Sequence, residues 1–431
     1  MHLKWYLLGM VLFAIGCATT EISPTAEPVP TETAVSTPTQ PAATPIPPTT
    51  QPTAIPTATL IPAPTRVPQG SLPAGIVYQT GNDIWQNTVE GTPRLLFSSP
   101  ALSSDTARAK ISPQGDSLVV QDVRNETFLV DLASGERTVF DITEQPDVPG
   151  YMRDLTWWPG QPEEIIVLFS LDGDHYRSGL ALANRDGTNW RALADGVELW
   201  NDFDQHPTEA VIAATNNGEP LLLYANGRSQ PLDLAAYNLP TDRAYFSPSW
   251  SPDGRLLAWQ FADLQTTTLY SNTMGIALLD LESSTTQILP DLITYTADGP
   301  LPSVRWSPDG RFFAHVNLYG GPTIIFQADG RELLRSEQVF SRWLSDSTRF
   351  LTTRTRSLAW QGFFLISVED GTETAVELPI RIGATHLGPN DQILIRPEWN
   401  VPQLYFVYDA TSNQLTQIEW PDGAIFLAWV P

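Results

Sequence analysis

The chain has 431 residues, and its composition changes sharply near residue 70. Residues 18–70 contain 27 Pro or Thr among 53 positions, which excludes a packed core there, whereas almost all of the 14 Trp, 12 Tyr and 17 Phe follow and can bury a large core. The formal net charge of −24 excludes nucleic acid or an anionic membrane surface as the main partner, and the single Cys excludes a disulfide framework and a Cys-type zinc site.

The first segment predicts a targeting signal. Lys4 precedes an apolar run of 11 residues, which is too short for a membrane span of about 20 residues but suits a signal peptide. The run ends in Ala14-Ile15-Gly16-Cys17, which resembles a bacterial lipobox with Ala14 where Leu is usual. This resemblance implies a signal peptide over residues 1–17, lipidation of Cys17, and a membrane-anchored, extracytoplasmic protein. An ordinary secretory signal with a chance cysteine is the alternative.

Residues 18–70 predict a stalk without regular structure. Repeated Pro fixes φ, removes backbone donors and favours the extended polyproline II conformation. At ~3.1 Å per residue the 53 residues reach at most ~160 Å, and as a flexible coil they span nearer ~40 Å. We therefore expect this segment to hold a folded domain, residues 71–431, away from a membrane.

A turn motif repeats through the folded part. The clearest copies are Trp250-Ser251-Pro252-Asp253-Gly254 and Trp306-Ser307-Pro308-Asp309-Gly310, each followed by an apolar run. With the looser copies included, the first motif position, here called the anchor, recurs with a mean spacing of about 45 residues. The anchors are residues 111, 157, 205, 250, 306, 343, 387 and 429. A period of ~40–50 residues with four strands per unit is typical of a β-propeller blade.

The motif itself predicts a hairpin turn, because Pro presets φ, Asp can bond the following backbone and Gly allows positive φ. It resembles the repeat of the TolB-type, WD-repeat-like propeller family, over essentially the whole folded part. That resemblance implies an all-β propeller. By analogy with TolB-type periplasmic proteins, it also implies a role as an assembly partner in envelope transport.

Eight blades are expected, with seven as the rival because the copy at Gln205 is poor. Residues Ile76–Gln79, Ile84–Gln86 and Arg94–Leu96 predict three strands that lack an inner partner, whereas residues Ala424–Val430 predict an inner strand that lacks outer ones. Together, these four predicted strands form one blade, which closes the ring. This pairing between the N-terminal and C-terminal parts of the propeller is here called the clasp. Closure stabilises a propeller because an open ring exposes blade faces and strand edges.

No motif predicts catalysis, a cofactor or a metal centre. No nucleophile elbow, phosphate loop or dinucleotide fingerprint follows a predicted strand. His2 belongs to the predicted signal peptide, and the other four His lie in different repeats without metal-ligand spacing. The turn residues Asp253, Asp309 and Asp346 are expected to cap their turns rather than to bind a metal. Asp172 and Asp174 form a weak calcium candidate that offers too few oxygens.

The candidate ligand site is a rim of mixed charge at one mouth of the central channel, in the connections that enter the inner strands. Such a rim can bind a protein, peptide or glycan, and a solvated loop face is the alternative. The rim residues are Asp105, Arg108, Arg153, Asp154, Trp200, Asp202, Asp242, Arg243, Asp298, Arg342, Arg381 and Asp422.

The sequence thus favours a monomeric, non-catalytic binding or scaffold module. A propeller enzyme that acts on glycan or polysaccharide is the alternative, and two or three carboxylates converging at one mouth would identify it. The mark of an envelope-transport assembly partner would be an exposed apolar patch on one face.

Overall fold

The computed structural model describes residues 59–61, 69–98, 108–121, 127–140, 151–161, 163–170, 178–193, 199–216, 218–263, 272–295, 303–316, 322–353, 362–378, 382–397 and 404–430. These residues belong to one compact unit, residues 55–431. Cys17, the signal peptide and most of the predicted stalk lie outside the described residues.

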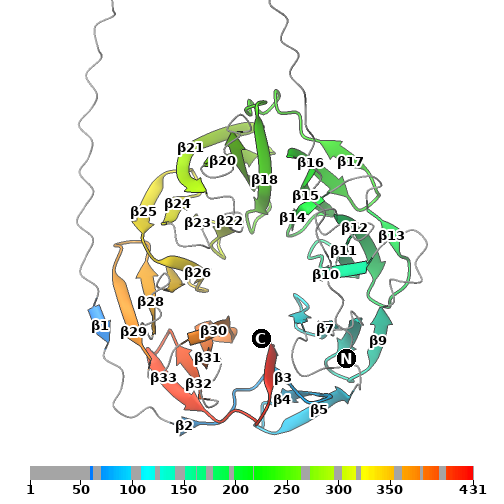
Figure 1. Ribbon diagram of the computed structural model, residues 1–431, viewed down its shortest axis with the longest axis vertical. Coiled ribbons are helices and arrows are strands. Elements are labelled where there is room, and N and C mark those ends of the chain that lie inside the picture. Colours follow the sequence, from blue (N-terminus) through cyan, green and yellow to red (C-terminus); the bar gives the residue numbers. More distant parts are fainter. Residues whose placement is uncertain are drawn as a thin grey trace, which may run out of the picture. The chain divides into compact units, whose positions relative to one another are not determined.

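Eight antiparallel blades of four strands form a ring, so the chain is a β-propeller (Figure 1). The prediction of eight blades is confirmed, and the seven-blade alternative is wrong. The short 3-10 helix Pro389–Asp391 is the one helix among the described residues. None of the helical structure described is long and apolar enough to cross a membrane.

The strands of each blade run from the channel outward. Blade 1 is β34 (Ile425–Trp429), β3 (Ile76–Thr80), β4 (Asp83–Asn87) and β5 (Pro93–Ser98). Blade 2 is β6 (Arg108–Ile111), β7 (Ser117–Gln121), β8 (Thr127–Asp131) and β9 (Arg137–Phe140). Blade 3 is β10 (Tyr151–Trp157), β11 (Glu164–Ser170), β12 (Ser178–Asn184) and β13 (Arg191–Ala192). Blade 4 is β14 (Leu199–Gln205), β15 (Val211–Asn216), β16 (Glu219–Tyr224) and β17 (Ser229–Pro231).

The second half of the ring repeats this plan. Blade 5 is β18 (Arg243–Trp250), β19 (Leu256–Asp263), β20 (Asn272–Asp280) and β21 (Thr285–Tyr295). Blade 6 is β22 (Ser303–Trp306), β23 (Phe312–Val316), β24 (Thr323–Gln327) and β25 (Glu332–Ser336). Blade 7 is β26 (Val339–Trp343), β27 (Arg349–Thr353), β28 (Gly362–Ser367) and β29 (Glu373–Glu377). Blade 8 is β30 (Ile382–Leu387), β31 (Gln392–Pro397), β32 (Tyr405–Asp409) and β33 (Gln414–Ile418).

The core lies between the blades. The middle strands are uninterrupted apolar runs, because neighbouring blades cover both faces of each sheet. One cluster, for example, joins Val211 and Leu222 of blade 4 to Trp250, Leu257 and Trp259 of blade 5. Each blade therefore depends on its neighbours to bury its apolar faces.

Indole groups at the anchors tie consecutive blades together. The Nε1 of Trp157 donates a hydrogen bond to a backbone carbonyl of blade 2, at a distance of 3.3 Å. Trp306 and Trp343 make the same bond to the blades before them, at 3.2 and 2.8 Å. In all three bonds the acceptor residue immediately precedes the anchor of the neighbouring blade. These three anchors thus fix the backbone of the inner strand in the preceding blade.

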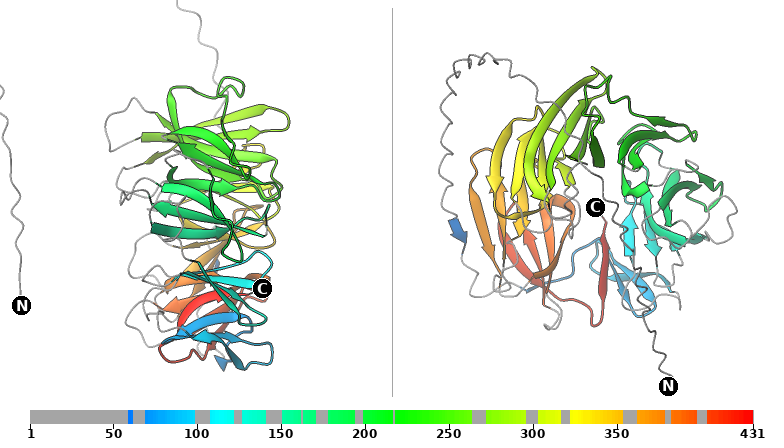
Figure 2. Two further views of the ribbon diagram at one scale, coloured as in Figure 1. Left: turned by 90° about the vertical axis from the view of Figure 1, so that its right-hand side faces the viewer. Right: turned by 45° about the horizontal axis from the view of Figure 1, so that its top comes forward.

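The C-terminal strand closes the ring. β34 pairs antiparallel with β3, and Figure 2 shows the red C-terminal strand beside the blue strands of this blade. In the register of the pair, Trp429 lies opposite Ile76 and Ala428 opposite Val77. The Nε1 of Trp429 donates to the Ala74 carbonyl at 3.0 Å, and its side chain is buried. A Cβ on Gly388 would lie 2.3 Å from the Trp429 ring, so blade 8 needs glycine there. The predicted clasp is confirmed.

Two short strands lie within the predicted stalk. β1 (Thr59–Ile61) adds parallel to the outer edge of β29, and β2 (Gln69–Gly70) adds parallel to β33. The prediction that residues 18–70 lack regular structure is therefore wrong for these five residues. The outer edges of blades 7 and 8 supply backbone partners that the segment cannot provide for itself.

We expect Trp429→Ala to lower the free energy of unfolding by ~3–5 kcal/mol, because the substitution empties a buried aromatic site. Deletion of residues 424–431 should cost more, since it also leaves β3 with an unpaired edge. Thermal or urea unfolding measures both, and deletion of eight residues between positions 18 and 50 is the control. Unfolding of all three variants like the full-length protein would contradict the clasp.

His315 is a titratable group in the core. It is fully buried on β23 and faces the equally buried Gln260 of β19, with 3.4 Å between Nε2 and Oε1. Burial, with a smaller effect of the Arg335 charge, lowers the pKa of His315 from 6.5 to about 3. The imidazole therefore stays neutral in the folded protein at any pH above that value.

The unfolded chain takes up the His315 proton below pH 6.5, and the folded protein does not until about pH 3. Stability contributed by neutral His315 is thus complete above pH 6.5 and is lost as the pH falls toward 3. We expect His315→Gln to reduce the loss of unfolding free energy between pH 7.5 and 4.5 by about 2–3 kcal/mol. Urea unfolding at the two pH values measures this, and an unchanged pH dependence would refute it.

Candidate functional site

Most of the predicted rim residues lie inside inner strands. Asp242 and Asp422 are exposed in the turns before β18 and β34. Asp105, Asp298 and Arg381 lie outside the described residues. The rim residues found on inner strands are Arg108, Arg153, Asp154, Trp200, Asp202, Arg243 and Arg342.

The expectation that these residues lie in connecting loops is therefore wrong, because the inner strands begin earlier than expected. Bulges lengthen several of these strands, for example between Phe340 and Arg342. Arg243 is seven residues before its anchor Trp250, whereas Arg342 is one residue before Trp343. Six residues of strand span about 20 Å, so these two arginines lie near opposite ends of the channel. Arg243 has an exposed neighbour, Asp242, at 3.7 Å.

The calcium candidate, Asp172 and Asp174, lies outside the described residues. In the part of the chain that is described, no group of three or more His, Cys, Asp or Glu side chains converges as a metal site would. The expectations of no metal and no cofactor stay predictions.

The turn aspartates cap their turns, as predicted. Asp253 accepts hydrogen bonds from the Ser251 hydroxyl at 2.6 Å and from the Arg255 backbone at 3.1 Å. Asp309 and Asp346 accept equivalent backbone bonds from the residues that follow them. These carboxylates therefore stabilise their own turns.

His206 takes over the capping role in the poorest copy of the motif. Its Nδ1 accepts the backbone N–H groups of Thr208 and Glu209, at 3.2 and 2.8 Å. Its Nε2 lies 3.0 Å from the Gly254 carbonyl of the next blade. A Cβ on Gly254 would lie 2.3 Å from the imidazole, and Gly254 has a φ of +75°, so glycine is required there. This histidine is structural.

Two of the cavities that the described residues line are candidate ligand sites. The first, here called the channel pocket, has a volume of about 480 Å³ and involves the inner strands β18, β22 and β26. Its lining contains two arginines, several aromatic side chains and no carboxylate. The lining residues are Ser249, Trp250, Val304, Arg305, Trp306, Pro308, Val316, Phe340, Ser341, Arg342 and Trp343.

Arg342 is the one predicted rim residue that lines this pocket. Its Nη2 donates to the Thr385 carbonyl of blade 8 at 3.2 Å, and its buried Nε has no partner among the described residues. Burial lowers the pKa of the Arg342 guanidinium, which nevertheless stays charged. Next to it, burial and then the Arg342 and Arg396 charges lower the pKa of His386 to about 4, so this imidazole is neutral near pH 7.

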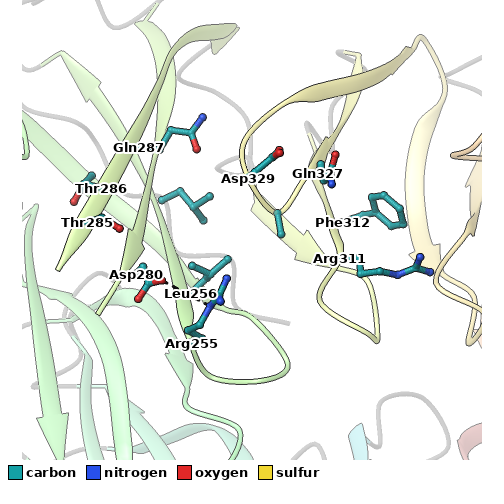
Figure 3. A pocket seen from close by; sticks show the side chains of 12 residues that line it. Arg255, Leu256, Asp280, Thr285, Thr286, Gln287, Arg311, Phe312, Gln327 and Asp329 are labelled. Carbon is teal, nitrogen blue, oxygen red and sulfur yellow. Dashed lines mark ion pairs between the residues drawn. The ribbon is translucent and has the colours of Figure 1, made fainter. Parts of the chain in front are cut away.

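The second cavity, here called the blade 5–6 groove, has a volume of about 490 Å³. Figure 3 shows Gln287 from blade 5 and Asp329 from blade 6 on its two sides. Arg255 faces Asp280 across 3.7 Å in the same groove. The lining residues are Arg255, Leu256, Leu278, Asp280, Thr285, Thr286, Gln287, Arg311, Phe312, Gln327, Ala328 and Asp329.

Sequence reasoning missed both cavities, although the repeats contain signals for them. The residue after the Ser-Pro-Asp-Gly turn is Arg in both clear copies, and these arginines, Arg255 and Arg311, line the groove. The residue before the anchor is Arg305 in blade 6 and Arg342 in blade 7, and both line the channel pocket. An alignment of the repeats would have found each pair.

The sequence matches no family model and no curated protein. Among solved structures it is similar to dihydro-heme d1 dehydrogenase NirN, with 17% identity, a TM-score of 0.53, and coverage of 84% of this chain and 77% of that one. It is also similar to Porphyromonas gingivalis dipeptidyl peptidase 4, with 12% identity, a TM-score of 0.51, and coverage of 74% and 53%. The chain thus spans about half the length of that peptidase.

TolB from Acinetobacter baumannii also matches, with 17% identity, a TM-score of 0.35, and coverage of 62% of this chain and 64% of that one. The eight-bladed ring itself confirms the β-propeller fold that the sequence repeat implies. At such identities the likenesses concern the fold alone. Although two of these structures are named as enzymes, a likeness of fold alone does not decide between binding and catalysis.

Proposed function

We propose that this chain is a lipid-anchored, extracytoplasmic protein whose propeller binds a glycan without transforming it. The blade 5–6 groove carries the proposal. Amide, hydroxyl and charged groups from two blades line it, and Phe312 adds apolar surface. A sugar presents hydroxyl groups around its edge and C–H groups on its faces, so it can use both kinds of surface.

The carboxylates of the groove favour binding over catalysis. Asp280 accepts the backbone N–H groups of Glu282 and Ser283, at 3.1 and 3.0 Å. The backbone hydrogen bond from Ser283 is the largest of the effects that hold the pKa of Asp280 below its ordinary value. Asp329 accepts the backbone N–H of Arg331 at 3.0 Å. A glycan-cleaving enzyme needs a carboxylic acid of raised pKa, and Asp280 is shifted in the opposite direction.

The role as an assembly partner has less support. An assembly partner would be expected to expose an apolar patch on one face. Among the described residues, the exposed large apolar side chains are Val89, Leu95 and Val139. They come from blades 1 and 2 only, on a turn and two outermost strands. Three such side chains offer less apolar surface than a stable protein interface normally buries.

Attachment to a membrane through a lipid on Cys17 remains part of the proposal. Cys17 stands at the end of an apolar segment, and the chain has no other cysteine. The Pro- and Thr-rich residues that follow would separate the ligand groove from the membrane. A lipid-held, acidic propeller on such a spacer suits the capture of a ligand near a cell surface.

We expect Gln287→Ala to weaken glycan binding about 5- to 10-fold, because it removes a side chain with two donors and an acceptor from the groove. The full-length protein is first screened on a glycan array, and the best glycan is then titrated by calorimetry. Gln414→Ala is the control, since Gln414 is also an exposed Gln on an outermost strand, β33. The proposal fails if no glycan is retained, or if both variants bind like the parent.

We expect mature protein from a bacterial host to carry diacylglycerol on Cys17, and Cys17→Ala to release the protein from membranes or to stall its processing. Intact-mass spectrometry of the membrane fraction measures the modification. An unmodified Cys17 in mature protein would exclude the lipid anchor while leaving the glycan proposal open to its own test.

A further inference from the structure

Three consecutive blades place a basic side chain directly before the anchor. Arg305 precedes Trp306 on β22, Arg342 precedes Trp343 on β26, and His386 precedes Leu387 on β30. Because the blades repeat, the same register position lies at a similar depth in the channel in each of them. The three side chains therefore form a basic arc on one side of the channel.

Hydrogen bonds and a ring contact between neighbouring blades hold these three residues in place. The indole of Trp343 donates to the Arg305 carbonyl at 2.8 Å, which fixes the backbone that carries Arg305. Arg342 donates from Nη2 to the Thr385 carbonyl at 3.2 Å, so its guanidinium reaches toward blade 8. His386 lies against Phe426 of blade 1, with ring centroids 4.1 Å apart.

The charges of this arc have no counterions in the part of the chain that the structure describes. No carboxylate lines the channel pocket, and Arg305 and Arg342 form no ion pair with a described residue. The buried Nε of Arg342 and Nε2 of His386 also have no hydrogen-bond partner there. A half-buried guanidinium without a counterion and with an unpartnered Nε is costly, and an anion that accepts from it would offset the cost.

The channel pocket combines the positive charge of two arginines with apolar surface, although the protein as a whole has a net charge of −24. The protein repels anions at long range, so an anion is retained only where local contacts are strong. Trp306, Phe340 and Trp343 provide apolar surface in the same pocket. Inorganic phosphate would leave that surface unused. A carboxylate joined to an apolar body would use both.

We propose that the channel pocket binds a small organic carboxylate, with the carboxylate on Arg342 and Arg305 and the apolar body against Trp306, Phe340 and Trp343. A volume of about 480 Å³ is within the range of small-molecule sites. His386, neutral near pH 7, supplies a further hydrogen-bonding nitrogen beside Arg342. This site is separate from the blade 5–6 groove and does not depend on the glycan proposal.

The test is calorimetric titration of the full-length protein with benzoate, phenylacetate and indole-3-acetate, each against its uncharged amide, and with inorganic phosphate. We expect at least one carboxylate to bind about 10-fold or more tightly than its amide and than phosphate. Binding of the amides at equal strength, stronger binding of phosphate, or no heat from any carboxylate would overturn the proposal.

The arginine variants locate the site. We expect Arg342→Gln and Arg305→Gln each to weaken carboxylate binding by about 10-fold or more, and Arg342→Lys to weaken it less. Arg255→Gln is the matched control, because Arg255 lines the blade 5–6 groove instead. Arg305 is exposed, so its variant decides the matter even if Arg342→Gln fails to fold. Binding unchanged by Arg305→Gln would place the ligand elsewhere and overturn the assignment.

Discussion

The pairing of β34 with β3 is the constraint on which the rest of the structure depends. Every blade buries its apolar faces against its two neighbours, so a ring with one gap would expose two faces and a strand edge. The last strand of the chain fills that gap beside the first strands of the propeller. Trp429 then packs against Gly388 of blade 8 and joins the first blade to the last.

The same repeat that packs the ring also decides which side chains line the channel pocket. The anchor indole is turned to the preceding blade and bonds the backbone there, as Trp343 does to Arg305. The residues that accept these bonds stand directly before the anchors of their own blades, so their backbone is fixed while the identity of their side chains can vary. Arg305 and Arg342 use that freedom to make a basic pocket in an acidic protein. Packing of the ring and the proposed binding pocket thus depend on one strand register.

The repeat could be predicted from the sequence because turn residues and apolar runs are local signals. Blade number and ring closure followed from counting them, and even the poor copy at His206 is a true turn. The cavities could not be predicted, because they arise between blades. Arg342 was predicted to lie in a loop, and only the pairing of β26 with β27 places it on an inner strand. The strand β1 was missed because its partner, β29, lies some 300 residues away in the sequence.

Hydrogen–deuterium exchange of the full-length protein, read by mass spectrometry, tests ring closure most directly. If β34 closes the ring, alternate backbone amides of residues 425–429 are hydrogen-bonded to β3, and this peptide should keep as much protection as the peptide of the inner strand β18. Slow exchange in both peptides is the result that closure requires. Complete exchange of the C-terminal peptide at the earliest time, with β18 protected, would show that the strand is a free tail and would contradict the account.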